Sequence, residues 1–258
     1  MVFAIFILSL GTVAVYLYFS RFFMDLPTGP IPLPPTISVS EGLLPENQVG
    51  LKEWAKYGEN DYIPVGNGFF LKLEGGTVIA VTTAHSVALH KSNHSLVTIA
   101  LSIAGQSGYI AEIDALYGEP GKPRYGRDMT VDYVLLCVDV AIDPDLVLSP
   151  DPRGEPQAGE RVMLYSGLGD GSGGMSVYSG TIMRVDRNGA WAVMDDDFSP
   201  AGMSGSPFLS EHTGKVVGMA IVAGSSGGRL MIGMHPIGSL VEKAESASNY
   251  PKIQDYQR

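Results

Sequence analysis

The stretch DFSPAGMSGSPF, residues 197–208, surrounds Ser204 with small residues and ends with a proline and a phenylalanine. Glycine, serine and proline are also the commonest residues of ordinary turns. Alone, this stretch therefore fits either a nucleophile or a plain turn between strands. A serine hydroxyl becomes a nucleophile at neutral pH only when a base takes its proton, and a carboxylate that orients the base makes it more effective. The rest of the sequence must supply these two groups.

Among the five histidines, only His85 stands at the end of a strong apolar segment, VIAVTTAHSVAL (residues 78–89). Asp132 opens a second apolar segment, DYVLLCVD. An ionised group there is costly unless it has a buried partner. Asp128, in GRDMTVD, is the alternative carboxylate, although its surroundings are typical of an exposed turn. The sequence therefore predicts His85 as the base and Asp132 as the group that orients it.

From about residue 50 the chain consists of short apolar segments rich in β-branched and aromatic residues, separated by turn signals such as EGG, RNG and HTGK. This pattern predicts an all-β fold. A proline-rich break, DPDLVLSPDPRGEPQAGE (143–160), divides the segments into two sets, which favours two packed barrels over one sandwich. Only IGSLVEKAESASNY (237–250) has helical spacing, which predicts a C-terminal helix.

The first 20 residues are almost entirely apolar, with no charge before Arg21. A helix of this length, at about 1.5 Å per residue, can cross a hydrocarbon core. We therefore expect an N-terminal transmembrane anchor over residues 1–23, with a cleaved signal peptide and a buried core helix as alternatives. Arg21 favours a cytoplasmic catalytic part under the positive-inside rule, but one arginine does not decide the side. The closely spaced prolines at 27, 30, 32, 34 and 35 then predict an extended stalk over residues 24–50, or a ligand for aromatic grooves.

Composition excludes several classes of function. Lys and Arg number 17 against 27 Asp and Glu, the net charge is −10, and no basic run is present, so we expect no nucleic-acid partner. Cys137 is the only cysteine, which excludes an intrachain disulfide and a cysteine-based metal cluster. The glycine-rich GLGDGSGG (167–174) lacks the Lys-Ser/Thr ending of a phosphate loop. We therefore expect neither a cofactor nor a metal.

In this order, TTAHS around His85, DYVLL at Asp132 and GMSGSP around Ser204 resemble the chymotrypsin-like (trypsin-fold) serine proteases. The resemblance covers about residues 62–240. It implies two packed six-stranded antiparallel β-barrels, with the histidine and aspartate on the first barrel and the serine on the second.

The domain boundaries follow from this resemblance together with the positions of the strand-length apolar segments and the proline-rich breaks. A protease domain is expected over residues 51–245, with a first barrel at about 55–143, a second at about 155–240, and a C-terminal tail over 246–258.

The resemblance also implies roles for individual residues. The backbone N–H groups of Gly202 and Ser204 would form an oxyanion hole. Phe198 would form a wall of the specificity pocket, and its apolar side chain argues against a preference for Lys or Arg, although the three aspartates at 195–197 weaken this argument. The substrate backbone would pair with the strand formed by Ile221, Val222 and Ala223.

Two positions depart from the secreted digestive members of that family. Met203 replaces the aspartate that pairs with a new N-terminus after zymogen cleavage, and Ser86 replaces a cysteine. We therefore expect no activation of that kind, and a closer likeness to the disulfide-free bacterial and viral branches.

These observations predict a membrane-anchored serine endopeptidase that cuts a protein or polyprotein substrate near the bilayer. The alternative is a catalytically inactive trypsin-fold module that serves as a binding or scaffold domain at a membrane. A non-protease β-sandwich on a stalk would leave the histidine and serine motifs unexplained.

Overall fold

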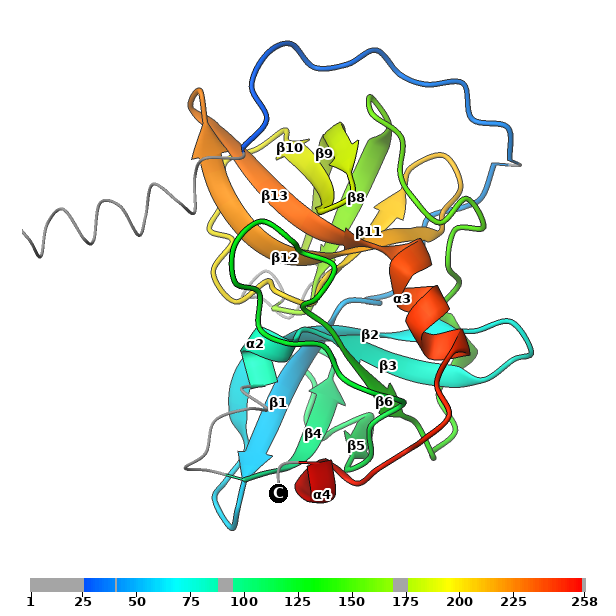
Figure 1. Cartoon of the computed structure of the whole chain (residues 1–258), viewed down its shortest axis with the longest axis vertical. Coiled ribbons are helices and arrows are strands. Elements are labelled where there is room, and N and C mark those ends of the chain that lie inside the picture. The colour runs from blue at the N-terminus through cyan, green and yellow to red at the C-terminus, as the bar shows by residue number, and fades with distance from the viewer. Residues whose placement is uncertain (1–25, 40, 88–94, 169–175, 257–258) are drawn as a thin grey trace, which may run out of the picture.

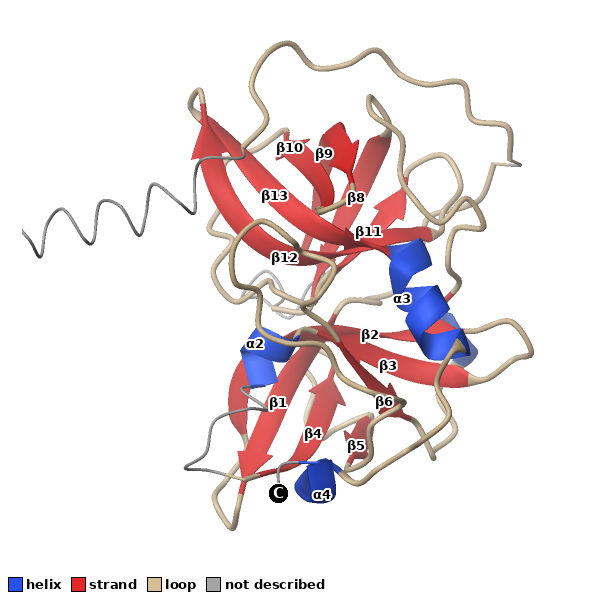
Figure 2. Cartoon of the chain, viewed as in Figure 1, coloured by secondary structure: helices blue, strands red, loops and turns tan. Residues whose placement is uncertain are grey.

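The computed structural model describes residues 26–39, 41–87, 95–168 and 176–256. It shows two stacked β-structured units joined by a long connection, with only short helices (Figures 1 and 2). Each unit has its own apolar core, and a third cluster of buried side chains draws on both units. The all-β prediction is confirmed.

The first unit is one sheet with the strand order β5-β4-β1-β2-β3-β6, and β7 pairs with β2 beside this path. Its strands are β1 (Leu51–Tyr57), β2 (Ile63–Lys72), β3 (Val78–Thr82), β4 (Leu96–Ser102), β5 (Ala111–Ile113), β6 (Val134–Cys137) and β7 (Val147–Leu148). The prediction of a closed, six-stranded antiparallel first barrel was wrong, because this sheet is open and β7 pairs in parallel with β2.

The open edge has a local cause. Beyond the end of β5, the chain meets β6 at an isolated bridge between Leu116 and Leu136. Past Gly118 and Pro120, single backbone hydrogen bonds still join Gly121 to Tyr133 and Lys122 to Val131. Glycine weakens a strand and proline lacks the N–H that a ladder needs, so these contacts do not form a regular ladder.

The second unit is a closed six-stranded barrel with the order β10-β13-β12-β11-β8-β9, as predicted. Its strands are β8 (Arg161–Ser166), β9 (Ser176–Asp186), β10 (Gly189–Met194), β11 (Pro207–Ser210), β12 (Val216–Ser226) and β13 (Arg229–Pro236). All of the neighbouring strands pair antiparallel.

Strand β2 is apolar on both faces because it contributes to two cores. Phe70 points into the core of the first unit, whereas Phe69 and Leu71 belong to the cluster shared by the two units. This double burial explains why the centre of the strand, FFL at 69–71, is continuously apolar rather than alternating.

The predicted C-terminal helix is confirmed as α3 (Ile237–Glu245), which buries Ile237, Leu240 and Ala244 in the cluster shared by the units. The other short helices are α2 (Ala84–Val87), η1 (Pro144–Leu146) and α4 (Ile253–Tyr256). Helix α4 lies in the segment expected to be a tail, and its Ile253 is buried in the core of the first unit.

The apolar segment expected to form a membrane anchor, residues 1–23, lies outside the described residues. Within the ranges that the structure describes, no helix has the length and hydropathy needed to span a bilayer.

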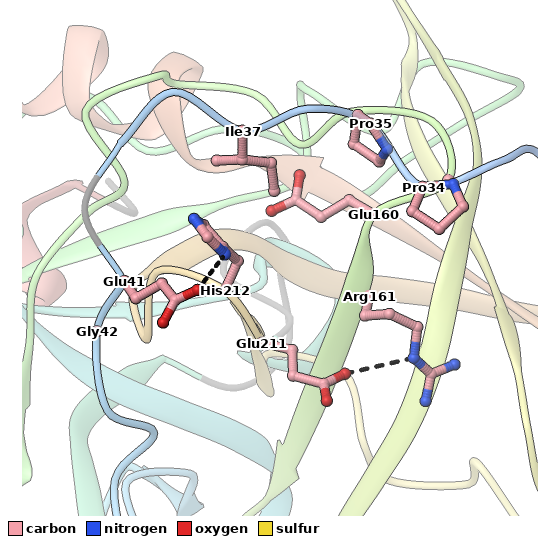
Figure 3. Close-up of a pocket in the computed structure, with 10 residues that line it drawn as sticks. Pro34, Pro35, Ile37, Glu41, Gly42, Glu160, Arg161, Glu211 and His212 are labelled. Atoms are coloured by element: carbon pink, nitrogen blue, oxygen red, sulfur yellow. Dashed lines mark hydrogen bonds and ion pairs between the residues drawn. The ribbon is translucent and has the colours of Figure 1, made fainter.

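The proline-rich segment is extended from residue 26 onward and runs over the second barrel (Figure 1). The N–H of Gly42 donates to the carbonyl of His212 at 3.0 Å, and His212 Nε2 donates to the Val39 carbonyl at 3.1 Å. Between this segment and the barrel lies a cavity of about 410 Å³, to which Pro34 and Arg161 contribute (Figure 3). None of the predicted site residues lines this cavity.

Candidate active site

Three predicted residues from separate segments meet between the two units. His85 lies on α2, directly after β3; Asp132 lies just before β6; and Ser204 lies in the turn between β10 and β11. His85 Nδ1 is 2.9 Å from Asp132 Oδ2, and His85 Nε2 is 2.8 Å from the Ser204 hydroxyl oxygen. A carboxylate can only accept, so Nδ1 carries the hydrogen and Nε2 is free to accept the hydroxyl proton. This arrangement can activate a serine hydroxyl.

The carboxylate of Asp132 is only 1% exposed and accepts hydrogen bonds on both oxygens. Besides the imidazole, the backbone N–H of His85 donates to Oδ1 at 3.0 Å and that of Arg124 donates to Oδ2 at 2.9 Å. Burial alone raises the pKa of Asp132, but the hydrogen bonds and the nearby imidazole outweigh burial, so its pKa lies below the ordinary value. Asp132 therefore stays ionised beside the ring.

Asp128, the alternative carboxylate, has a different local role. Its Oδ1 accepts hydrogen bonds from the backbone N–H and the hydroxyl of Thr130, at 2.9 and 2.7 Å. This is the geometry of a side chain that closes a turn.

The turn around Ser204 requires glycine at two positions for different reasons. Gly202 has φ +81°, a conformation that L side chains rarely adopt, whereas nothing blocks the space beside it. At Gly205, a Cβ atom would lie only 1.9 Å from the carbonyl oxygen of Asn67. Within the described residues, the N–H groups of Gly202 and Ser204 donate to no other group. Both are available to an incoming anion.

Strand β12 contains the three residues predicted to pair with a substrate. On the β11 side, its ladder ends near Ala220, and among the described strands none continues it. Val222 and Ala223 beyond this point are half-buried. Ile221 is 4% exposed and packs into the cluster shared by the units, so its side chain does not face a ligand.

Phe198 lies half-buried and stacks on Tyr178, with ring centroids 3.8 Å apart. Both rings, together with Ala223, pack against the core of the second barrel. Of the three neighbouring aspartates, Asp195 is paired with Arg161 at 2.6 Å. The other two are exposed.

Two buried polar residues close to this turn were missed in the sequence. Glu53 on β1 and Asn67 on β2 are both fully buried, although each lies in a strand that contributes to a core. The sequence pattern that could have identified them is the one that identified Asp132: a polar side chain within an apolar strand.

Glu53 is fully buried. A Cβ atom placed on Gly66 would lie 3.2 Å from Glu53 Oε2 and 3.1 Å from the carbonyl oxygen of Ser204, so the carboxyl group lies behind the nucleophile turn. Burial raises the pKa of Glu53 to about 8, and the nearby Thr82 hydroxyl lowers it by less. Glu53 is therefore mainly protonated at pH 7.

The described residues contain no group of three or more His, Cys, Asp or Glu side chains arranged to hold a metal ion.

Comparisons with known proteins agree with this geometry. A sequence model of the "Trypsin-like peptidase domain" family matches residues 66–219. A search of curated proteins finds no significant match.

Similar solved structures include a thermostable serine protease, AL20, from an extremophilic microorganism (TM-score 0.53, 12% identity, 78% of this chain and 97% of that one). Tobacco etch virus protease in complex with product is also similar (TM-score 0.50, 14% identity, 83% and 86%). So is kallikrein-related peptidase 10 (TM-score 0.50, 16% identity, 76% and 93%). At these identities the structural likeness concerns the fold.

Proposed function

The chain belongs to the trypsin-like peptidase family, and from this premise we propose that it is a serine endopeptidase that uses Ser204 as nucleophile, His85 as base and Asp132 as the orienting carboxylate. The observation that carries the proposal is the chain of contacts from Asp132 through His85 to the Ser204 hydroxyl, at 2.9 and 2.8 Å. The His85 side chain is 35% exposed, so a substrate can reach the base.

The reaction then follows from the roles of these groups. As the Ser204 hydroxyl attacks a peptide carbonyl, its proton passes to His85 Nε2, and Asp132 stabilises the resulting imidazolium. The free N–H groups of Gly202 and Ser204 stabilise the oxyanion. His85 next donates the proton to the leaving amine, and water hydrolyses the acyl-enzyme with His85 again as base. No cofactor or metal takes part in this scheme.

For the substrate, we propose an extended peptide segment that pairs with the backbone of β12 from Ile221 to Ala223. The support is the edge of β12 beyond Ala220, which has no partner strand among those described. Exposed strand edges accept peptides by adding a strand. The stacked rings of Phe198 and Tyr178 give the proposed pocket an apolar wall. We therefore propose that the substrate residue before the cleaved bond has an apolar side chain, since the wall carries no acidic group to bind Lys or Arg.

The test of the nucleophile is labelling of the full chain with a fluorophosphonate, followed by peptide mass spectrometry. We expect the label at Ser204, and its loss in Ser204→Ala and His85→Ala. Ser199→Ala is the matched control, since this exposed serine lies on the same segment and has no part in the proposed site. A folded wild-type protein that stays unlabelled would contradict the proposal and favour the inactive scaffold.

We also propose that residues 1–23 anchor the protein in a membrane and that the protease acts on proteins near the bilayer. The support is the uncharged apolar length of the segment. The carbonyl of Gly29 accepts a hydrogen bond from Arg229 on β13, so the chain contacts the second barrel a few residues after the segment, which would hold the active site close to an anchor. After alkaline extraction and flotation in a density gradient, we expect the full chain to rise with the lipid vesicles and the chain starting at residue 24 to stay in the bottom fraction. If both proteins stay in the bottom fraction, anchoring is refuted.

A further inference from the structure

Asn67, on β2 of the first unit, contacts both the segment of the base and the turn of the nucleophile. Its backbone N–H donates to the carbonyl of Ser204 at 2.8 Å. Its backbone carbonyl accepts a hydrogen bond from the Thr82 hydroxyl at 3.0 Å. Thr82 lies three residues before His85. One residue therefore links the two segments whose separation sets the distance from His85 to Ser204.

The side chain of Asn67 adds two more contacts to the same turn. Its Nδ2 donates to the carbonyl of Gly202 at 3.1 Å and to the Ser206 hydroxyl at 2.8 Å. A backbone carbonyl can only accept, so the nitrogen of the amide must face Gly202, which settles the orientation of the side chain. Asn67 is fully buried, so water does not compete for these hydrogen bonds.

The contact with Gly202 matters because, before Ser204, the turn has one internal hydrogen bond, from the N–H of Met203 to the carbonyl of Pro200 at 3.1 Å. The second barrel holds Gly205 through a hydrogen bond to the carbonyl of Ala220 at 2.8 Å. Met203, immediately before the nucleophile, is 5% exposed and apolar, so its side chain adds no hydrogen bond to the turn, and the amide of Asn67 is the side-chain group that holds the Gly202 carbonyl. Gly202 also has a positive φ angle, a backbone conformation that glycine can leave easily unless contacts hold it.

We propose that Asn67 is a positioning residue: its side chain holds the carbonyl of Gly202, and so keeps the backbone of the nucleophile turn in the conformation that directs the N–H groups of Gly202 and Ser204 at an oxyanion. This inference rests on the proposed function of Ser204 and deepens it. Asn67 touches neither substrate nor the reacting atoms, so its effect is on the rate of the chemical step. Substrate affinity, which depends on β12 and on the pocket at Phe198, is unaffected.

The experiment compares wild type, Asn67→Ala and Asn67→Leu in the full chain. The Leu variant removes the amide donors and keeps a side chain of similar size without adding a charge, which separates lost hydrogen bonds from lost packing. Ser102→Ala is the matched control, because it removes one partly buried hydrogen bond, the 2.8 Å contact from Trp54 Nε1 to the buried Ser102, at a site unconnected with the turn. The measurements are kcat and KM for a peptide amide, and amide hydrogen exchange of a peptide covering residues 198–208.

For both Asn67 variants we expect kcat to fall about 100-fold, the size seen when an oxyanion donor is lost, with KM changed less than about threefold and faster exchange in the turn. Ser102→Ala should show neither effect. A kcat within threefold of wild type, or unchanged exchange at residues 198–208, would overturn the inference. The two proposals can fail separately. A wild type that fluorophosphonate does not label at Ser204 would refute the proposed function. Hydrogen exchange needs no activity, so it would still show whether Asn67 holds the turn.

Discussion

Replacing Asp132 by asparagine is expected to lower kcat about 10⁴-fold with little change in fold, as for the equivalent loss in serine proteases generally. The reason lies in the donors around the carboxylate. Two backbone N–H groups and His85 Nδ1 all donate to its oxygens. An asparagine must turn its own NH₂ group toward one of these donors. If it faces the ring, Nδ1 has to accept, the hydrogen moves to Nε2, and His85 can no longer accept the Ser204 proton.

The measurement is kcat and KM for a peptide amide at neutral pH, with unfolding followed in parallel. Asp128→Asn is the matched control, because this aspartate lies four residues away and its side chain closes the turn to Thr130. It should retain wild-type kcat. Equal losses in the two variants, or a loss below about tenfold for Asp132→Asn, would refute the assignment of Asp132.

Replacing Glu53 by glutamine is expected to stabilise the protein by about 3 kcal/mol at pH 7. The pKa of Glu53 is raised by burial from 4.5 to about 8 in the folded protein. Between these values the folded state keeps a proton that the unfolded chain has lost. Stability is therefore fully present below about pH 4.5 and falls by about 1.4 kcal/mol per pH unit until about pH 8. Glutamine has no proton to lose, so the variant lacks this slope.

Urea unfolding at pH 5, 7 and 9 tests this prediction. The variant should be little more stable than wild type at pH 5, with a difference that grows at pH 7 and again at pH 9. Glu74→Gln, at an exposed position after β2, is the matched control and should show no such trend. A difference between Glu53→Gln and wild type that is the same at pH 5 and pH 9 would show that Glu53 does not titrate in this range.

Local sequence patterns predicted the parts of the protein that depend on neighbouring residues. Strand-length apolar runs and turn signals predicted the β-structure and the closed second barrel, and helical spacing predicted α3. The motifs around His85, Asp132 and Ser204 are equally local, since each combines a polar residue with an apolar strand or a glycine turn. The structure brings these three side chains together.

Other features depend on contacts between distant segments, which a single sequence does not encode locally. Closure of the first sheet depends on how the chain after β5 meets β6, and there it forms an isolated bridge and single backbone hydrogen bonds in place of a strand ladder. The proline-rich segment was expected as a stalk, and its extended backbone packs on the second barrel through Gly42 and His212.

The sequence by itself determined which residues can form strands, turns and a serine nucleophile, because these properties arise from side-chain chemistry and backbone preference over a few residues. Only the tertiary structure decided the roles of Glu53 and Asn67. A buried carboxyl changes its pKa according to what surrounds it, and an amide acts on a turn only when folding brings it within about 3 Å. Asn67 and Gly202 lie 135 residues apart in the chain, so this contact exists only after both units have folded and packed together.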